Sequence, residues 1–451
     1  MIHIIAVHRT IGAILTALLI AAAVPAGTFA QPAARRVSFA ELAGTVTQSN
    51  LQLRASALDV AVAEAQLAQA RAGRQPQVAA SGSYTRVQQQ AGQTISFANP
   101  FGPSPPVISF TLPPPDPNIY AARLALQFPL YTGGRLESQI ALAEANLRGA
   151  RAVFARAQQQ ILFSAQQLYL QALLGHENVT AAQRALTQAN ESLRVANARV
   201  STGAAPQFDN LQAQVAVANA EQGVVRARTS VAAAQTGLIA TLNLTQDTPL
   251  EFTDTLEPRP VPGTLRDAIV RALRDRPEFA ELQSRLAAAQ ASIDLAASGG
   301  RPNVTISGGY DVGNANGAAA SVSGGWSITL SATLSLYDGG ITRERIREAQ
   351  LRMEQLKVLD AHTRQQVELE VRQAWLALEQ AAGELLAAAR AVDQGREAAR
   401  LAGVRYQAGV GTQLELLSAQ ASLAQAELGL ASARFSQNLA RIQVILAAGS
   451  I

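Results

Sequence analysis

The chain has 451 residues, of which 48% are hydrophobic and only 5% aromatic, and its formal net charge at pH 7 is +4. This alanine-rich composition suits long helices packed over small side chains better than a few dense globular cores. Arginines are scattered rather than clustered with aromatics, which argues against nucleic-acid binding, and the absence of cysteine excludes disulfides, thiolate metal sites and a lipid-modified N-terminal cysteine.

Residues 1–30 have the pattern of a signal peptide. A weakly basic start precedes an apolar run at 11–24, and small residues end the segment at Ala30. The apolar run is about 14 residues, short of the roughly 20 that a transmembrane helix needs. We therefore expect an exported protein whose mature chain begins at Gln31 and has no transmembrane helix.

The remainder reads as two copies of one unit. A spacing of 206 positions recurs between equivalent residues of the two halves: Tyr131 and Tyr337, Tyr169 and Trp375, Gly203 and Gly409. We expect a first repeat at 31–245, a proline-rich linker at 246–263 and a second repeat at 264–451. A period this long is too large for a solenoid and favours duplication of a whole half-protein.

Each repeat opens with a predicted helix. Capping boxes at Ser38-x-x-Glu41 and Thr264-x-x-Asp267 mark the two starts, and the helices are expected to run to about residues 73 and 298. Each helix then gives way to strands.

Four strands are expected, two in each repeat, at about 77–87, 119–130, 303–312 and 325–336. In the last strand Trp326, Ile328 and Leu330 alternate with serines and threonines. An apolar face opposite a hydroxyl face over about ten residues matches a membrane strand with lipid on one side and water on the other. A soluble, half-buried strand is the alternative.

A tyrosine and a Gly-Gly pair end the second strand of each repeat. The residues of these two joints are Tyr131, Gly133 and Gly134, and Tyr337, Gly339 and Gly340. After each joint we expect a helix of about 67 residues, a rod on the order of 100 Å long, then a short break and a returning helix with heptad spacing. The helical hairpins are expected at about 134–245 and 340–446.

The number of strands indicates whether one chain can form a membrane barrel alone. Four strands cannot close a barrel around a water-filled lumen, and an open sheet in lipid leaves edge groups unpaired. The expected fold is therefore mostly α with membrane β-strands. Three chains contribute four strands each to a trimeric 12-stranded β-barrel, which continues into a long α-helical barrel of antiparallel coiled-coil hairpins. The glycines of the joints permit the bend between the two barrels.

Several local signatures now carry a resemblance. They are the segment RDRPEFAELQSRLAAAQASIDLAASGGRPNVTISGGYD (274–311), the two Y-x-G-G joints, and RYQAGVGTQLELLSAQ (405–420). The chain resembles the outer-membrane efflux proteins, the family of TolC-like exit ducts. The resemblance implies a homotrimeric channel in the Gram-negative outer membrane, in contact with its lipid, with a long periplasmic extension. It also implies a tripartite efflux or type I secretion system, with a periplasmic adaptor protein and an inner-membrane pump as partners.

The resemblance also assigns roles to the two hairpin tips. Asp209, Glu415 and Tyr406 correspond to a periplasmic gate. The residues expected to contact the adaptor are Val200, Gly203, Ala204, Gly409, Val410 and Thr412. Gly411 and Ser418 replace a family arginine and a family carboxylate, which argues against both an ionic lock and strong cation selectivity. Glu415 also completes a capping box with Thr412, so its role as a helix cap stays open beside a pore-facing role.

Catalytic chemistry has no sequence support. No catalytic triad, phosphate loop or paired-carboxylate motif is present, and His176 and His362 are far apart on predicted helix surfaces. We expect neither an enzyme nor a cofactor nor a metal site. A periplasmic adaptor or a structural coiled-coil protein of the envelope is the alternative, although an adaptor normally has a single hairpin and compact β-domains.

The loop at 88–118 contains eight prolines. Proline favours extended, loosely ordered chain and disrupts continuous sheet. We expect this loop on the outside of the cell, as a lid over the exit or as a surface epitope.

Overall fold

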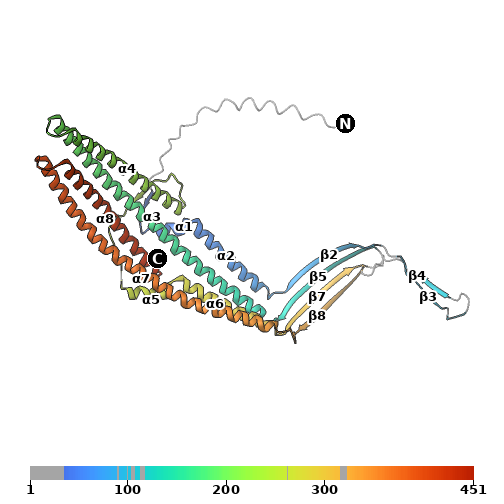
Figure 1. Cartoon of the computed structure of the whole chain (residues 1–451). Helices are drawn as coiled ribbons and strands as arrows, with labels where there is room; N and C mark the ends of the chain where they lie inside the picture. Colours follow the sequence, from blue (N-terminus) through green and yellow to red (C-terminus); the bar gives the residue numbers. More distant parts are fainter. Residues whose placement is uncertain are drawn as a thin grey trace, which may run out of the picture.

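The computed structural model describes residues 35–88, 91–98, 100–102, 107–111, 117–261, 263–314 and 322–450. The expected signal peptide at 1–30 lies outside the described residues. The molecule is elongated: helices form one end, a four-stranded sheet extends from them, and a separate two-stranded hairpin lies at the far end (Figure 1).

Two antiparallel helical hairpins form most of the molecule. The first pairs α3 (Arg135–Ser201) with α4 (Gln207–Thr241), and the second pairs α7 (Ile341–Gln407) with α8 (Gln413–Ala447). Both α3 and α7 have 67 residues and both returning helices have 35. At about 1.5 Å per residue, each long helix measures roughly 100 Å.

The helix that opens each repeat is broken in two, so the expectation of one continuous helix was wrong. In the first repeat α1 (Leu42–Ser49) ends at Asn50, whose side chain accepts hydrogen bonds from the first backbone amides of α2 (Leu51–Ala72). In the second repeat α5 (Leu265–Asp275) and α6 (Pro277–Ser298) are separated by Arg276, because the residue before a proline avoids helical geometry.

The two predicted capping boxes had different outcomes. The box at Thr264 is confirmed, with both the Thr264 and the Asp267 side chains hydrogen-bonded to backbone amides. In the first repeat Ser38 Oγ accepts a hydrogen bond from Glu41 N at 3.3 Å, but α1 begins only at Leu42 and has no side-chain cap.

The four long strands form one antiparallel sheet in the order β2–β5–β7–β8. Their bounds are Gln77–Arg86, Asn118–Tyr131, Asn303–Gly313 and Ser323–Thr333. The last strand was expected to reach residue 336, but its pairing ends at Thr333. The register sets Leu124 of β5 opposite Tyr310 of β7, and Tyr310 opposite Trp326 of β8.

The proline-rich loop contains a β-hairpin, contrary to the expectation of irregular chain. β3 (Thr94–Ala98) pairs with β4 (Val107–Thr111) in an antiparallel ladder. The eight prolines all lie outside these two strands, so none removes a ladder donor.

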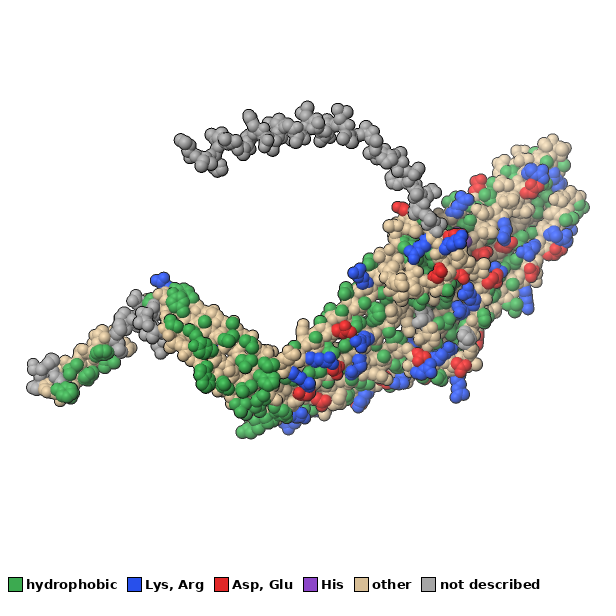
Figure 2. All heavy atoms as spheres, turned by 180° about the vertical axis from the view of Figure 1, so that it is seen from behind, with side chains coloured by type: hydrophobic (Ala, Val, Ile, Leu, Met, Phe, Trp, Pro, Cys, Tyr) green, Lys and Arg blue, Asp and Glu red, His purple; other side chains and the backbone are tan. Residues whose placement is uncertain are grey.

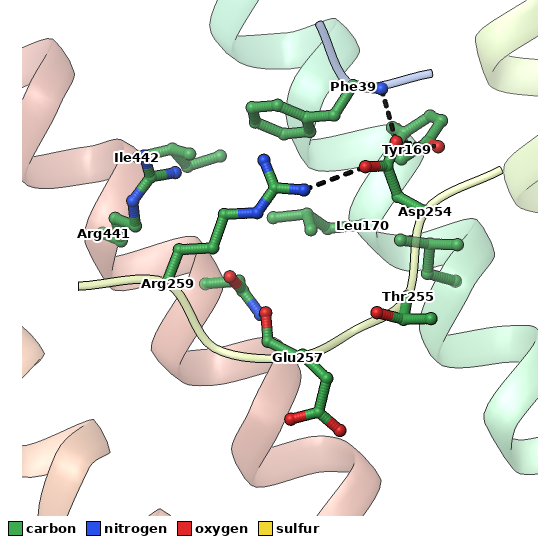
Figure 3. Close-up of a pocket in the computed structure, with 11 residues that line it drawn as sticks. Phe39, Tyr169, Leu170, Asp254, Thr255, Glu257, Arg259, Arg441 and Ile442 are labelled. Carbon is green, nitrogen blue, oxygen red and sulfur yellow. Dashed lines mark hydrogen bonds and ion pairs between the residues drawn. The ribbon is translucent and has the colours of Figure 1, made fainter. Parts of the chain in front are cut away.

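A compact core joins the linker to the middle of the helices. β1 (Arg35–Val37) and β6 (Leu250–Phe252) pair in parallel, and β6 belongs to the segment expected to be only a linker. Tyr169 of α3 is fully buried beneath this pair, and its hydroxyl donates to the Asp254 carboxylate at 2.8 Å. Asp254 also accepts hydrogen bonds from Phe39 N and from the Arg259 guanidinium (Figure 3).

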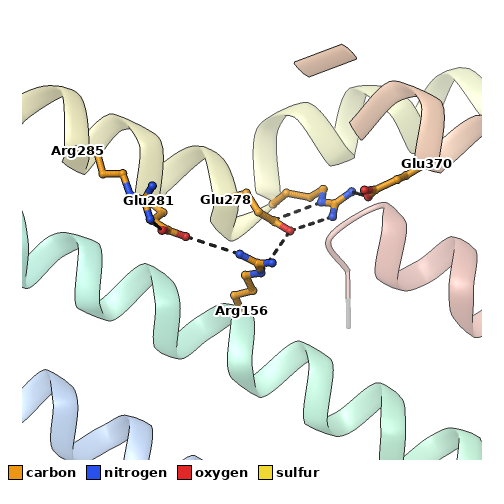
Figure 4. A network of polar contacts seen from close by, with 6 residues as sticks. Arg156, Glu278, Glu281, Arg285 and Glu370 are labelled. Atoms are coloured by element: carbon orange, nitrogen blue, oxygen red, sulfur yellow. Dashed lines mark hydrogen bonds and ion pairs between the residues drawn. The ribbon is translucent and has the colours of Figure 1, made fainter. Parts of the chain in front are cut away.

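A charged network ties three helices together at the break between α5 and α6. Arg156 of α3 lies between Glu278 and Glu281 of α6, and Arg276 connects Glu278 with Glu370 of α7 (Figure 4). The Arg276 side chain is only 12% exposed, so its charge-assisted bonds to Glu278 and Glu370 are better shielded from water than the contacts of Arg156, which is 60% exposed.

Helix α3 is central in the protomer. It packs on α2 and α6 near the sheet and on α4 and α8 near the hairpin tips, whereas α7 packs on α5, α6 and α8. Helices α2 and α4 therefore form one flank of the molecule and α7 forms the other.

Candidate functional site

One face of the sheet is apolar along all four strands. The register of the strands brings the following exposed side chains to that face: Val78, Tyr84, Tyr120, Leu124, Leu126, Tyr310, Trp326, Ile328 and Leu330. Trp326 is 77% exposed and Leu330 is 65% exposed, and hydrophobic side chains cover this part of the molecule in Figure 2. A soluble monomer rarely exposes so long a contiguous apolar surface.

The opposite face consists mainly of small polar side chains. Serine and threonine dominate it: Ser81, Ser83, Thr85, Thr305, Ser307, Ser327, Thr329, Ser331 and Thr333. The predicted alternation of an apolar face with a hydroxyl face is confirmed in β2, β7 and β8, whereas β5 places Ala121, Arg123, Ala125 and Gln127 on the second face and no hydroxyl. A sheet with one lipid-compatible face and one hydroxyl face is the arrangement of a membrane β-barrel wall.

The sheet does not close on itself. β2 and β8 are its edge strands, and in the described part of the chain each has a partner on one side only. In a bilayer every unpaired backbone group costs several kcal/mol. The sheet therefore requires further strands at both edges.

The two glycine joints adopt the same backbone conformation. Gly133 and Gly134 have φ of 64° and 88°, and Gly339 and Gly340 have φ of 67° and 87°. This left-handed region favours glycine, so these residues allow each strand to turn into its 67-residue helix.

Different partners brace the two joints. Arg301 donates to the Gly133 carbonyl at 3.2 Å, whereas Asp338 accepts from the amides of Gly340 and Thr342 at 2.9 and 2.8 Å. The first joint is therefore held by Arg301 of the other repeat and by its own Thr132, whose Oγ1 accepts from Leu136 N at 3.2 Å, whereas the second is held by its own aspartate. Tyr337 is 89% exposed and Tyr131 is 50% exposed.

The two hairpin tips close in the same way. Gly203 and Gly409 both have φ of 78°. Ala204 N donates to Arg199 O at 2.8 Å, and Val410 N donates to Arg405 O at 3.0 Å. Each tip is thus a Schellman motif that ends the long helix at a left-handed glycine. Val410 is 69% exposed, and Val200, Ala204 and Thr412 also lie at these tips.

Tyr406 is buried beneath an arginine from the other hairpin. It is 2% exposed, and the Arg199 guanidinium lies 4.5 Å from the centre of its ring. Arg199 Nη1 also donates to the Tyr406 carbonyl at 2.7 Å. Burial raises the pKa of the Tyr406 phenol, Asp209 acts in the same direction, and Arg199 opposes them.

Sequence reasoning missed Arg199. A signal was present, because Arg199 and Arg405 are separated by the same 206 positions as the other repeated residues. The two arginines nevertheless have different partners: Arg405 Nε lies 3.8 Å from Glu415 Oε2 within its own hairpin, whereas Arg199 crosses to Tyr406.

The two predicted gate carboxylates differ in exposure. The Glu415 side chain is 52% exposed, and Glu415 N donates to Thr412 Oγ1 at 3.1 Å, so one half of the expected capping box is present. Asp209 is half-buried in the first turn of α4 and lies close enough to Tyr406 to affect its pKa.

The two histidines of the described residues do not belong to a metal-ligand cluster. No three histidine, aspartate or glutamate side chains converge there as a metal site, and His176 packs edge-on against Phe252 with ring centres 5.6 Å apart. Across the same residues, no helix contains a stretch that is both long enough and apolar enough to cross a membrane.

Comparison with known proteins gives a family and a fold. The sequence model of the family described as outer membrane efflux protein matches residues 42–244 and 268–450. The chain is similar to Protein CyaE of Bordetella pertussis, with 28% identity over 313 residues, 67% of this chain and 64% of that relative. It is also similar to outer membrane protein OprJ of Pseudomonas aeruginosa, with 28% identity over 190 residues, 42% of this chain and 39% of that protein. The aligned segments thus span less than two thirds of either relative.

The likeness to solved structures extends over most of the chain. The crystal structure of the Campylobacter jejuni CmeC outer membrane channel superposes with a TM-score of 0.75 at 16% identity, covering 91% of this chain and 85% of that one. Because the sequence identity is low, this likeness establishes the fold.

Proposed function

The chain belongs to the family of outer membrane efflux proteins, and from this premise we propose that it is the exit duct of a tripartite efflux or type I secretion system. It would conduct cargo passively from an inner-membrane pump across the periplasm and the outer membrane. The family consists of outer-membrane channels rather than enzymes. One observation carries the proposal: a sheet with a lipid-compatible face and two unpaired edges continues, through glycine joints, into helices of about 100 Å.

A homotrimer satisfies both requirements of the sheet. If β8 of one copy pairs with β2 of the next, three copies give twelve strands and leave no edge. The apolar face then lies toward lipid and the hydroxyl face lines a water-filled lumen.

The helical flanks support the same assembly. Exposed apolar side chains on α7 include Leu351 and Val358, and Leu369 and Leu376, two pairs with heptad spacing. The opposite flank carries Phe208, Leu211 and Val215 on α4 at steps of three and four. These are the spacings with which coiled-coil helices pack, so α7 of one copy would pack against α2 and α4 of its neighbour.

We place the periplasmic gate of this duct at Tyr406, Asp209 and Glu415. The contact of Arg199 with Tyr406 supports this assignment, because it joins the two hairpins of a protomer where the tips would converge. In a trimer Asp209 and Glu415 would contribute six carboxylates near the entrance. Glu415 can serve there while its backbone is capped by Thr412.

The adaptor protein would contact the two tips. Their proposed contact residues are Val200, Gly203, Ala204, Gly409, Val410 and Thr412. The matching Schellman motifs support this assignment, since a trimer would present six similar tips to the adaptor. Selection of cargo would then belong to the pump.

The trimer is tested by changing the α7 flank. We expect wild-type protein to cross-link as a trimer in the outer-membrane fraction. In the L369E/L376E variant the amount of cross-linked trimer should fall at least tenfold, because two charges would be buried between helices. The matched control is L369M/L376M, which keeps both positions apolar and should retain the trimer.

Two results would contradict the proposal. A soluble or inner-membrane monomer would favour a periplasmic adaptor instead. A trimer that tolerates both glutamates would remove α7 from the subunit interface.

A further inference from the structure

The hydroxyl face of the sheet carries one pair of charges. Among its described residues, Arg123 of β5 and Asp311 of β7 are the only charged side chains. They are direct partners in the β5–β7 register, and Arg123 Nε lies 3.4 Å from Asp311 Oδ1. All other side chains of that face are uncharged.

Surrounding glycines leave the pair uncovered. Gly309 lies beside Arg123, so closely that a Cβ there would be 3.7 Å from the guanidinium nitrogens Nε and Nη2, and Gly325 is the partner of Asp311 on β8. The pair forms part of a shallow hollow whose other lining residues include Ser81, Ser83 and Ser323. The Arg123 and Asp311 side chains remain 59% and 55% exposed.

Stability is a poor explanation for this pair. An ion pair exposed to water contributes only about 0–1 kcal/mol, and the long ladders on both sides already fix the register of β5 and β7. The pair lies toward the end of the sheet that is remote from the helices, because Arg123 is near the start of β5 and Asp311 near the end of β7.

We propose that Arg123 and Asp311 form a balanced charged ring near the outer mouth of the barrel and keep the exit from selecting cargo by charge. This inference rests on the proposed trimeric duct, in which three guanidinium groups and three carboxylates would face the lumen. Each arginine attracts anionic groups of a passing solute and each aspartate attracts cationic groups, and their opposite charges cancel at a distance. Removing one partner leaves three like charges on the wall of a water-filled lumen.

The test measures block of single channels by multivalent ions added on the extracellular side of a planar bilayer. R123Q should bind hexamminecobalt(III) roughly tenfold more tightly than wild type, and D311N should bind citrate roughly tenfold more tightly. The double variant R123Q/D311N should return both blocking concentrations to the wild-type range. T329A, which removes a neutral hydroxyl from the same face, serves as the matched control and should shift neither.

The outcomes separate this inference from the proposed function. Channels in which neither single variant changes block would overturn the charged ring and leave the duct intact, whereas a wild-type protein that forms no channel would overturn the duct. If the double variant fails to assemble as a trimer, the pair is structural and the inference is wrong. The swapped variant R123D/D311R preserves both charges, and the two ions should block it at the wild-type concentrations.

Discussion

The two halves of the molecule share one order of helices and long strands but differ in burial. Each half has two opening helices, two long strands, a glycine joint, a 67-residue helix and a 35-residue returning helix. Yet α3 buries 17 of its residues and α7 only six. Helix α3 has neighbours on both sides, whereas α7 has them on one side only. Similar sequences at repeated positions thus meet different surroundings, and the free side of α7 is where a second copy is expected.

Equivalent positions show the same divergence. Tyr169 is fully buried beneath β1 and β6, while Trp375, 206 positions later, is half-buried and donates its indole N–H to Glu379. At the tips, Arg199 crosses to the other hairpin while Arg405 stays within its own. Substituting both members of each equivalent pair tests whether their different surroundings give them different effects on stability or gating.

The largest difference is expected between Y169A and W375A. Tyr169→Ala removes a buried ring and the hydroxyl that donates to Asp254, which should lower the free energy of unfolding by about 3–5 kcal/mol. Trp375→Ala should cost about 1–2 kcal/mol because its side chain is already partly exposed. Chemical unfolding in detergent, followed by helical circular dichroism, measures both. Equal losses would mean that the halves contribute equally to the core.

The glycine joints should rank next. G133A and G339A both impose a left-handed φ on a residue with a Cβ, which costs about 1–2 kcal/mol. At Gly133 that Cβ would also lie 2.7 Å from Arg301 Cβ, whereas Gly339 has open space around it. We expect an additional cost of about 1–3 kcal/mol for G133A only, measured as the difference between the two midpoints of unfolding. A larger effect at Gly339 would contradict the described packing of the first joint.

A smaller effect is expected on the pH dependence of stability, and it comes from Asp254, which is bound to residues of the first repeat and of the linker. Burial alone would raise the pKa of Asp254, but hydrogen bonds from Phe39 N, Tyr169 and Arg259 outweigh it and hold that pKa below its ordinary value. Its contribution, about 1 kcal/mol, is therefore present at neutral pH and is lost as the pH falls below about 4 through the lowered pKa.

The variant D254N should flatten this acid-sensitive part of the stability curve. The control D294N changes an exposed carboxylate of α6 and should leave the curve unchanged. An unaltered acid response in D254N would show that the hydrogen bonds around Asp254 do not stabilise the linker.

The smallest stability effect, under about 1 kcal/mol, is expected at the tips. R199A removes the contact between hairpins and should increase the time that single channels spend open. R405A removes only an exposed pair within one hairpin and should leave the open time near that of wild type. An equal increase of the open time in both variants would mean that both arginines help to keep the channel closed.

Local sequence patterns predicted much of the fold. The long helices, the alternation of the strands and the glycine joints follow from periodicities and backbone preferences that act over a few residues. The break at Pro277 was also readable, because proline restricts Arg276 before it. The hairpin of β3 and β4 was not predicted, because the many prolines of the loop suggested irregular chain throughout. The two strands themselves contain no proline.

By itself, the sequence determined where the four long strands lie, which face of each is apolar and where each long helix begins, because these depend on neighbours along the chain. Only the tertiary structure decided that β6 pairs with β1, that Arg199 reaches Tyr406 and that Arg123 meets Asp311. These contacts join residues far apart in the chain, and their partners are selected by how the helices and strands pack in space rather than by spacing along the sequence.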